Sequence, residues 1–150
     1  MSQSLSLLEF KELDQNSILN YLPIIQELLP FVKNQYILLE NFKLLSSWGR
    51  VFIGVENSGL PVAFCQIHLD QNLEGLKSLI VDELVVSKEF RSLGIGSEVL
   101  KYVEDYARQR ELLIIDISSS IKRKLAHKFY KKNNYTKSYF GFDKRVTSVR

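Results

Sequence analysis

The segment LIVDELVVSKEFRSLGIGSEVLKYVEDYARQR, from Leu79 to Arg110, decides the fold of this 150-residue chain. Its first part, Leu79 to Val86, is apolar and largely β-branched except for two adjacent acids, and this predicts a buried strand. Its last part predicts a core-facing helix over residues 97–110, because apolar residues recur there at helical spacing: Val99, Leu100, Val103 and Ala107. A short turn with two glycines joins the predicted strand to the predicted helix.

That turn, Arg91-Ser92-Leu93-Gly94-Ile95-Gly96, favours an anion-binding site, with a plain strand-to-helix turn as the alternative. The N–H groups at the start of a helix lack intrahelical partners, and the helix dipole favours negative charge there. Glycine adds unusual φ angles and lets a ligand approach the backbone. Two common phosphate loops do not fit. Val99 stands where a dinucleotide-binding fingerprint needs a small residue, and no Gly-Lys-Ser/Thr occurs.

The pattern Arg-x-x-Gly-x-Gly after a strand of type Glu-Leu-x-Val resembles the acetyl-CoA-binding segment of the GNAT N-acetyltransferases. A second stretch, SSSIKRKLAHKFY from Ser118 to Tyr130, is similar to the Arg-x-x-Ala-His-x-Phe-Tyr motif of that family. Asn134 replaces the glycine that follows in many members, and Asn also tolerates the left-handed cap conformation. The C-terminal pattern as a whole resembles the aminoalkylphosphonate acetyltransferase branch of the family.

Composition and charge limit the class of protein. An apolar fraction of 45% and a charged fraction of 25% are ordinary for a soluble globular protein. No apolar run approaches the ~18–20 residues of a membrane span, and no signal-peptide plan opens the chain. The lone Cys65 predicts no intramolecular disulfide and a reducing cytoplasm, and it is expected to be a small core residue and not a nucleophile. A net charge of +3 is too mild to indicate nucleic acid.

The pattern along the chain predicts a single domain over residues 1–150, in the α/β (α+β) class, with a mixed central sheet flanked by helices. Pro23 either kinks or begins the first helix, and the sequence leaves this open. The strand after the helix over 97–110 is expected to run parallel to Leu79–Val86, because a helix crosses between them. The order β-α-α-β-β-β-α-β-α-β, which the resemblance also implies, has these expected elements: strand 6–13, helix 17–29, helix 32–45, strand 51–56, strand 61–69, strand 79–86, helix 97–110, strand 112–117, helix 124–133 and strand 139–146.

Acetyl transfer to an amine needs a group that takes a proton from the ammonium and a group that protonates the leaving thiolate. Glu83 is the candidate base, directly or through a water, because burial in an apolar strand would bring a carboxylate into range for proton transfer. The alternative is that the strand is splayed or at an edge here, and that the acid pair simply faces water. Strand alternation points Asp82 to the opposite face. The resemblance implies that Tyr130 is the acid, with a packing aromatic beside Phe129 as the alternative.

The resemblance implies acetyl-CoA as the acyl donor, contacted in three places. The pyrophosphate would be held by Arg91 and by backbone N–H groups of the turn and helix start: Ser92, Leu93, Gly94, Ile95, Gly96 and Ser97. Backbone groups of Leu84, Val85 and Val86 would pair with the pantetheine arm as an added strand does. Ser120, which stands where relatives often have Asn, would supply one hydroxyl to the same arm.

Histidines and basic residues supply the remaining candidates. His68 ends a strand that leads toward the expected acceptor cleft and is a substrate-side candidate, whereas His127 is expected to pack or cap. Two histidines so far apart make no metal site by themselves, so no metal is predicted. The basic run from Lys122 to Lys132 is expected to be a solvated helix face, with the CoA 3′-phosphate or an anionic acceptor as the alternatives.

The resemblance therefore implies direct transfer of the acetyl group from acetyl-CoA to a primary amine of a small molecule, such as an aminoalkylphosphonate. Polyamines, amino sugars, and a protein N-terminus or lysine remain open as acceptors. A non-catalytic acyl-CoA-binding module is a second class of function, and a basic interaction domain with steeply salt-dependent nucleic-acid binding is a third. No nucleic acid and no membrane are expected as partners, and a homodimer is left open.

Overall fold

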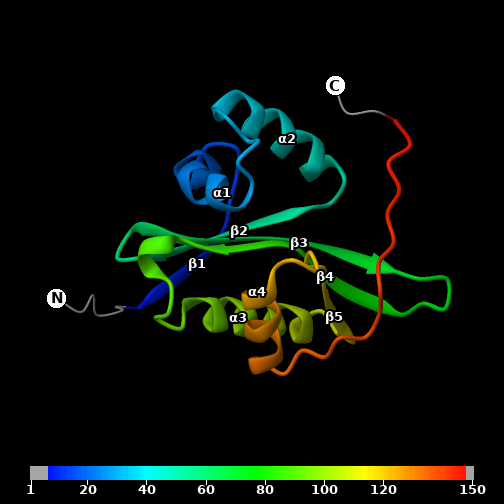
Figure 1. Cartoon of the computed structure of the whole chain (residues 1–150). Coiled ribbons are helices and arrows are strands. Elements are labelled where there is room, and N and C mark those ends of the chain that lie inside the picture. Colours follow the sequence, from blue (N-terminus) through cyan, green and yellow to red (C-terminus); the bar gives the residue numbers. More distant parts are fainter. Residues whose placement is uncertain (1–6, 148–150) are drawn as a thin grey trace. The chain divides into compact units, whose positions relative to one another are not determined.

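The computed structural model describes residues 7–147 and divides after Ser118 into two compact units. The first unit contains a five-stranded mixed sheet in the order β1-β2-β3-β4-β5 (Figure 1). The first three pairs of neighbours are antiparallel, and β4 pairs with β5 in parallel, as predicted. The strands are β1 Leu8–Glu12, β2 Val51–Asn57, β3 Leu60–Gln71, β4 Lys77–Val86 and β5 Ile114–Ile117.

Helices cover both faces of this sheet (Figure 1). On one face, α3 (Ile95–Gln109) buries Val99 and Val103 against the strands, which confirms the helical spacing read in the sequence. On the other face, α1 (Leu22–Leu28) and α2 (Gln35–Ser47) pack on a second apolar cluster around Phe52 and Phe64. Within residues 7–147, no helix is long and apolar enough to cross a membrane.

Local signals explain where the first helices begin. Pro23 occupies the first turn of α1, so it begins the helix and does not kink it, which resolves the alternative left open by the sequence. A short 3-10 helix, Ser17–Tyr21, precedes α1. The second helix begins at Gln35 and not at Val32, because the Asn34 side chain accepts the Ile37 N–H at 3.0 Å and caps it there.

The second unit contains α4 (Lys124–Lys132) and an extended tail. Asn134 adopts a φ of +68°, as its place in the motif predicted. The Tyr135 N–H donates to the Tyr130 carbonyl and the Asn134 N–H to the Lys131 carbonyl, both at 3.0 Å. This pair of hydrogen bonds is a Schellman motif, which ends the helix.

The strand predicted over residues 139–146 is wrong, because the structure shows no strand there. The aromatic residues suit a strand, but a strand also needs a second backbone with which to pair. Tyr139, Phe140 and Phe142 are all exposed instead. The observed order is therefore β-α-α-β-β-β-α-β-α. Because α4 buries no residue, the second unit shows no core of its own along its helix, and a single domain over 1–150 stays our prediction.

Candidate active site

β4 is irregular where the two acids lie. The register between β3 and β4 shifts by one residue at this point, which leaves Asp82 as the extra residue of a β-bulge. Val81 and Leu84 are three positions apart, yet both pack in the cluster that faces α3. The regular alternation therefore slips at the bulge. The argument that placed Asp82 on the face opposite Glu83 is wrong for this reason.

Asp82 is the centre of a polar cluster in the first unit. Its Oδ2 accepts a hydrogen bond from His68 Nδ1 at 2.8 Å and another from Gln66 Nε2 at 3.3 Å. Arg50, in the connection before β2, places its Nε 3.4 Å from the same oxygen. The cluster thus joins β3, β4 and the connection that leads into β2. Sequence reasoning missed it, although Gln66 and His68 are two polar residues on one face of an otherwise apolar strand.

Glu83 lies next to this cluster. In the register it is opposite Gln66, and its side chain is half-buried. The strand is not splayed at Glu83, since pairing with β3 continues on both sides of the bulge, but β5 pairs with β4 only as far as Val81, so Glu83 lies on an edge of the sheet among the described residues. Its role as base stays a prediction.

The outer edge of β4 is open beyond the bulge. β5 pairs with β4 from Ser78 to Val81, and in residues 7–147 no strand pairs with that edge further on. The segment from Leu84 to Val86, predicted to pair with the pantetheine arm, lies in this open part.

The phase of the ladder determines which of those backbone groups point outward. The Ser87 N–H donates to the Val62 carbonyl at 2.8 Å, so Ser87 directs its backbone N–H toward β3. Back along β4 to the bulge, backbone groups then point alternately to the outer edge and to β3. Val85 directs its N–H and C=O toward β3, whereas Leu84 and Val86 direct theirs to the open edge, where the Val86 carbonyl already accepts from Arg91 Nε. The main-chain groups of Leu84 and the N–H of Val86 can therefore pair with an added strand.

The turn after β4 presents N–H groups at the start of α3. Gly94 has a φ of +85° and Ser92 a φ of +64°, and the helix begins directly after Gly94. Its first bond runs from the Glu98 N–H to the Gly94 carbonyl, so the N–H groups of residues 95–97 lack an intrahelical acceptor. A Cβ at Gly94 would meet no atom within 4 Å. The turn is thus an open concave surface of the kind that binds anions.

Arg91 contributes the cation at this turn, but part of its side chain already has partners. Its Nε donates to the Val86 carbonyl at 3.0 Å, and its Nη2 lies 3.7 Å from a carboxylate oxygen of Glu27 on α1. Both oxygens of Glu27 also lie within 3.2 Å of the Lys88 N–H. Glu27 therefore fixes the start of the turn. Sequence reasoning missed it because the contact spans 61 residues.

The second unit holds the other predicted residues. The Tyr130 ring lies beside Phe129, with ring centroids 5.5 Å apart. His127 Nε2 donates to the Ser120 carbonyl at 2.8 Å, which ties α4 to the loop that precedes it. The roles predicted for Tyr130 and for the Ser120 hydroxyl stay predictions.

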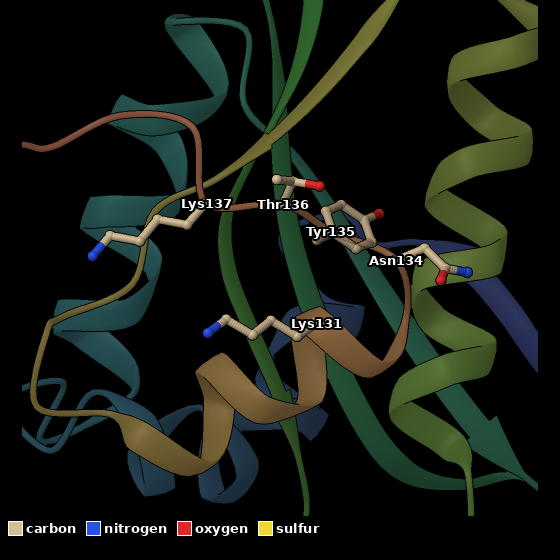
Figure 2. Close-up of a pocket in the computed structure, with 5 residues that line it drawn as sticks. All are labelled: Lys131, Asn134, Tyr135, Thr136 and Lys137. Carbon is tan, nitrogen blue, oxygen red and sulfur yellow. The ribbon is translucent and has the colours of Figure 1, made fainter.

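The basic residues of the second unit are exposed, which is compatible both with a solvated helix face and with an anion site: Lys122, Arg123, Lys124, Lys128, Lys131 and Lys132. A wide, open hollow lies at the end of α4. It is lined by Lys131, Lys137, Asn134, Tyr135 and Thr136. Figure 2 shows the Lys131 and Lys137 side chains extending to the same side, away from Asn134.

Cys65 is fully buried in β3, as predicted. Burial, together with the charges of Asp82 and Glu83, raises the pKa of its thiol, so the reactive thiolate does not form near neutral pH. The described residues 7–147 also contain no group of three or more His, Cys, Asp or Glu side chains placed to hold a metal ion.

Residues 20–135 match the Acetyltransferase (GNAT) family, and the chain belongs to this family. Aminoalkylphosphonate N-acetyltransferase from Salmonella typhimurium is 41% identical over 90 residues, which are 59% of this chain. The match spans 58% of that relative's own length.

Solved structures show the same fold. Ribosomal-protein-alanine N-acetyltransferase from Brucella melitensis superposes with a TM-score of 0.80 at 16% identity, over 94% of this chain and all of that one. An aminoglycoside N-acetyltransferase solved in complex with CoA gives 0.81 at 10% identity, over 99% of this chain and all of that one. At these identities the likeness concerns the architecture alone.

Proposed function

We propose that this chain is an acetyl-CoA-dependent N-acetyltransferase that transfers the acetyl group directly to a primary amine of a small molecule. The observation that carries the proposal is the open edge of β4 followed by the start of α3. There the N–H groups of residues 95–97, directly after Gly94, lack an intrahelical acceptor, and we call them the N–H cradle. A pantetheine arm offers amides that can pair with Leu84 and Val86, and a pyrophosphate offers the anion that the cradle accepts. Membership of the GNAT family and a neighbour solved with CoA support the same donor.

The environment of Cys65 favours direct transfer to the amine over a covalent acetyl-enzyme. The only cysteine has a buried thiol with a raised pKa, so an acetyl-cysteine intermediate is disfavoured. The amine itself must then attack the thioester, and it must first lose a proton. Glu83 is predicted to act on the amine, and Tyr130 is predicted to protonate the departing thiolate.

We propose an anionic amine, of the aminoalkylphosphonate type, as the acceptor. The support is the 41% identity to an enzyme of that name, together with the exposed cations of the second unit, which suit an anionic group. On the evidence of its lone Cys65, we expect the enzyme to work in a reducing cytoplasm.

The test is a thermal melt with and without acetyl-CoA. A ligand at ~100 times its Kd adds about 2.7 kcal/mol of stability. For a chain of this size that is a rise in Tm of about 5–10 °C. We expect Gly94→Ala to reduce the rise, because a side chain is strained at φ +85° and the cradle must distort.

Gly59→Ala is the matched control. Gly59 has a φ of +78° and equally open surroundings, but it lies in the β2–β3 turn. It should lower the Tm of the free protein by a similar amount and leave the rise with acetyl-CoA intact. No rise in the wild type at millimolar acetyl-CoA would overturn the proposal. A rise without release of free CoA from any amine tested would favour the non-catalytic acyl-CoA-binding module.

A further inference from the structure

We propose that His68, held by Asp82, takes the proton that the acceptor's ammonium must lose, and that Glu83 holds the charge of that ammonium. This inference rests on the proposed acetyl transfer. It changes the role of Asp82 from a solvent-facing acid to a positioning residue, and that of His68 from a substrate contact to a catalytic residue.

The contact with Asp82 fixes the tautomer of the imidazole. A carboxylate only accepts hydrogen bonds, so His68 Nδ1 must donate across the 2.8 Å contact. The lone pair of the neutral ring is then on Nε2. Enzymes use the same arrangement for a catalytic imidazole: a carboxylate orients one ring nitrogen, and the other nitrogen accepts the proton.

Arg50 helps to hold the Asp82 carboxylate in position. Its Nε is buried and makes no hydrogen bond, yet it lies 3.4 Å from the oxygen that binds His68. Gln66, also buried, donates to the same oxygen. The carboxylate is thus held from two sides, and the imidazole is its third partner.

The position of the cluster suits an amine about to attack the thioester. Asp82 is the bulge residue directly before Glu83, and the open edge proposed for the pantetheine arm begins at Leu84. His68 lies two residues along β3 from the residue opposite Glu83, a diagonal separation of roughly 7–8 Å across a sheet. Glu83 and His68 thus lie on neighbouring strands, on the same face of the sheet as Asp82.

The other charged groups around the imidazole favour a cation beside the ring. Arg50 faces it from the connection before β2, and Asp82 and Glu83 from β4, and these three groups sum to a net negative charge. Asp70, two residues further along β3, is exposed to solvent and is not part of this group. An ammonium is therefore attracted to the cluster before it gives up its proton.

The step balances as follows. The ammonium N–H bond breaks and its proton moves to His68 Nε2. The freed lone pair forms the N–C bond to the thioester carbonyl carbon, the C–S bond breaks, and the thiolate takes a proton from the predicted acid, Tyr130. The new N–C bond leaves a positive charge on nitrogen, which loses a second proton to solvent as the amide forms, and the Tyr130 phenolate regains a proton from solvent. The imidazolium then returns its proton to solvent, which its side chain, 18% exposed, can reach.

The experiment compares His68→Gln, Asp82→Asn and Glu83→Gln, with Asp70→Asn as the control on the same strand. The readout is kcat/KM for an aminoalkylphosphonate as a function of pH, with the acetyl-CoA melt run on each variant. We expect His68→Gln to lose about 10²–10³-fold near neutral pH. The loss should shrink about tenfold per pH unit as free amine becomes available at higher pH. Asp82→Asn should show a smaller loss with the same pH dependence, because it disturbs the tautomer without removing the ring.

The remaining outcomes are also decisive. Glu83→Gln should raise KM more than it lowers kcat, and Asp70→Asn should match the wild type. A loss in His68→Gln that is constant with pH, or a pH-dependent loss confined to Glu83→Gln, would overturn the assignment. If acetyl-CoA fails to raise the Tm of the wild type, the proposed function has failed instead. Ring ¹⁵N shifts of His68 give a readout independent of turnover, and an Nε2–H tautomer in the free protein would contradict the proposal.

Discussion

At the residue scale, the bulge at Asp82 changes what two neighbouring acids can do. In a regular strand Asp82 and Glu83 would face opposite sides, and only one of them could reach a substrate. One extra residue in β4 removes that alternation, and Asp82 reaches His68 and Gln66 on the neighbouring strand. The sequence shows two acids in an apolar run, but it contains no signal for the bulge. Register is a property of two strands together.

Gly54 is a second residue whose importance depends on packing. A Cβ at this position in β2 would overlap the ring of buried Tyr21 and lie 2.7 Å from Leu13 Cδ2. We expect Gly54→Ala to cost about 1–3 kcal/mol, because neither neighbour can move freely in a packed core. That is a fall in Tm of about 2–10 °C, measurable by calorimetry. Gly141→Ala, with open space around the added carbon, is the control, and an equal Tm for both variants would contradict the argument.

At the element scale, the β4–turn–α3 segment could be predicted from the sequence because its signals are local. The apolar run, the glycine at a left-handed φ and the helical spacing all lie between Leu79 and Arg110. The contact that fixes the turn could not be predicted in this way. Glu27 reaches the Lys88 N–H from α1, and nothing in the sequence near Glu27 indicates that partner.

Glu27→Gln tests how strongly α1 holds the turn. The variant keeps the size of the side chain but loses its negative charge. In the wild type that charge faces Arg91 and strengthens the hydrogen bond from the Lys88 N–H. We expect a loss of about 1 kcal/mol of local stability, seen as roughly fivefold faster amide exchange at Lys88. Glu40→Gln on α2 is the control, since its contact with Lys43 is long and exposed. Unchanged exchange at Lys88 in Glu27→Gln would show that the turn holds itself.

At the scale of the whole molecule, the proposed reaction draws on both units. Glu83, His68 and the N–H cradle belong to the first, and Tyr130 and Ser120 to the second. The sequence motifs indicate that both take part in one reaction.

Tyr130→Phe tests the contribution of the second unit. If the phenol protonates the leaving thiolate, kcat should fall by about 10²-fold, because general acids contribute on that scale. The rise in Tm with acetyl-CoA should persist, since the ring and its packing on Phe129 remain. Tyr139→Phe, an exposed tyrosine of the same unit, is the control. An unchanged kcat in Tyr130→Phe would mean that solvent supplies the proton.

The sequence by itself determined most of the elements, the parallel partner of β4, the burial of Cys65 and the left-handed cap at Asn134. Each of these follows from residues close together in the chain, where propensity and periodicity act. Tertiary structure decided the bulge at Asp82, its bond to His68, the anchoring of the turn by Glu27 and the absence of a strand over 139–146. Each of these depends on which backbone or side chain lies opposite a residue, and such a partner is distant in sequence. For the strand predicted over 139–146, no partner strand lies among the described residues.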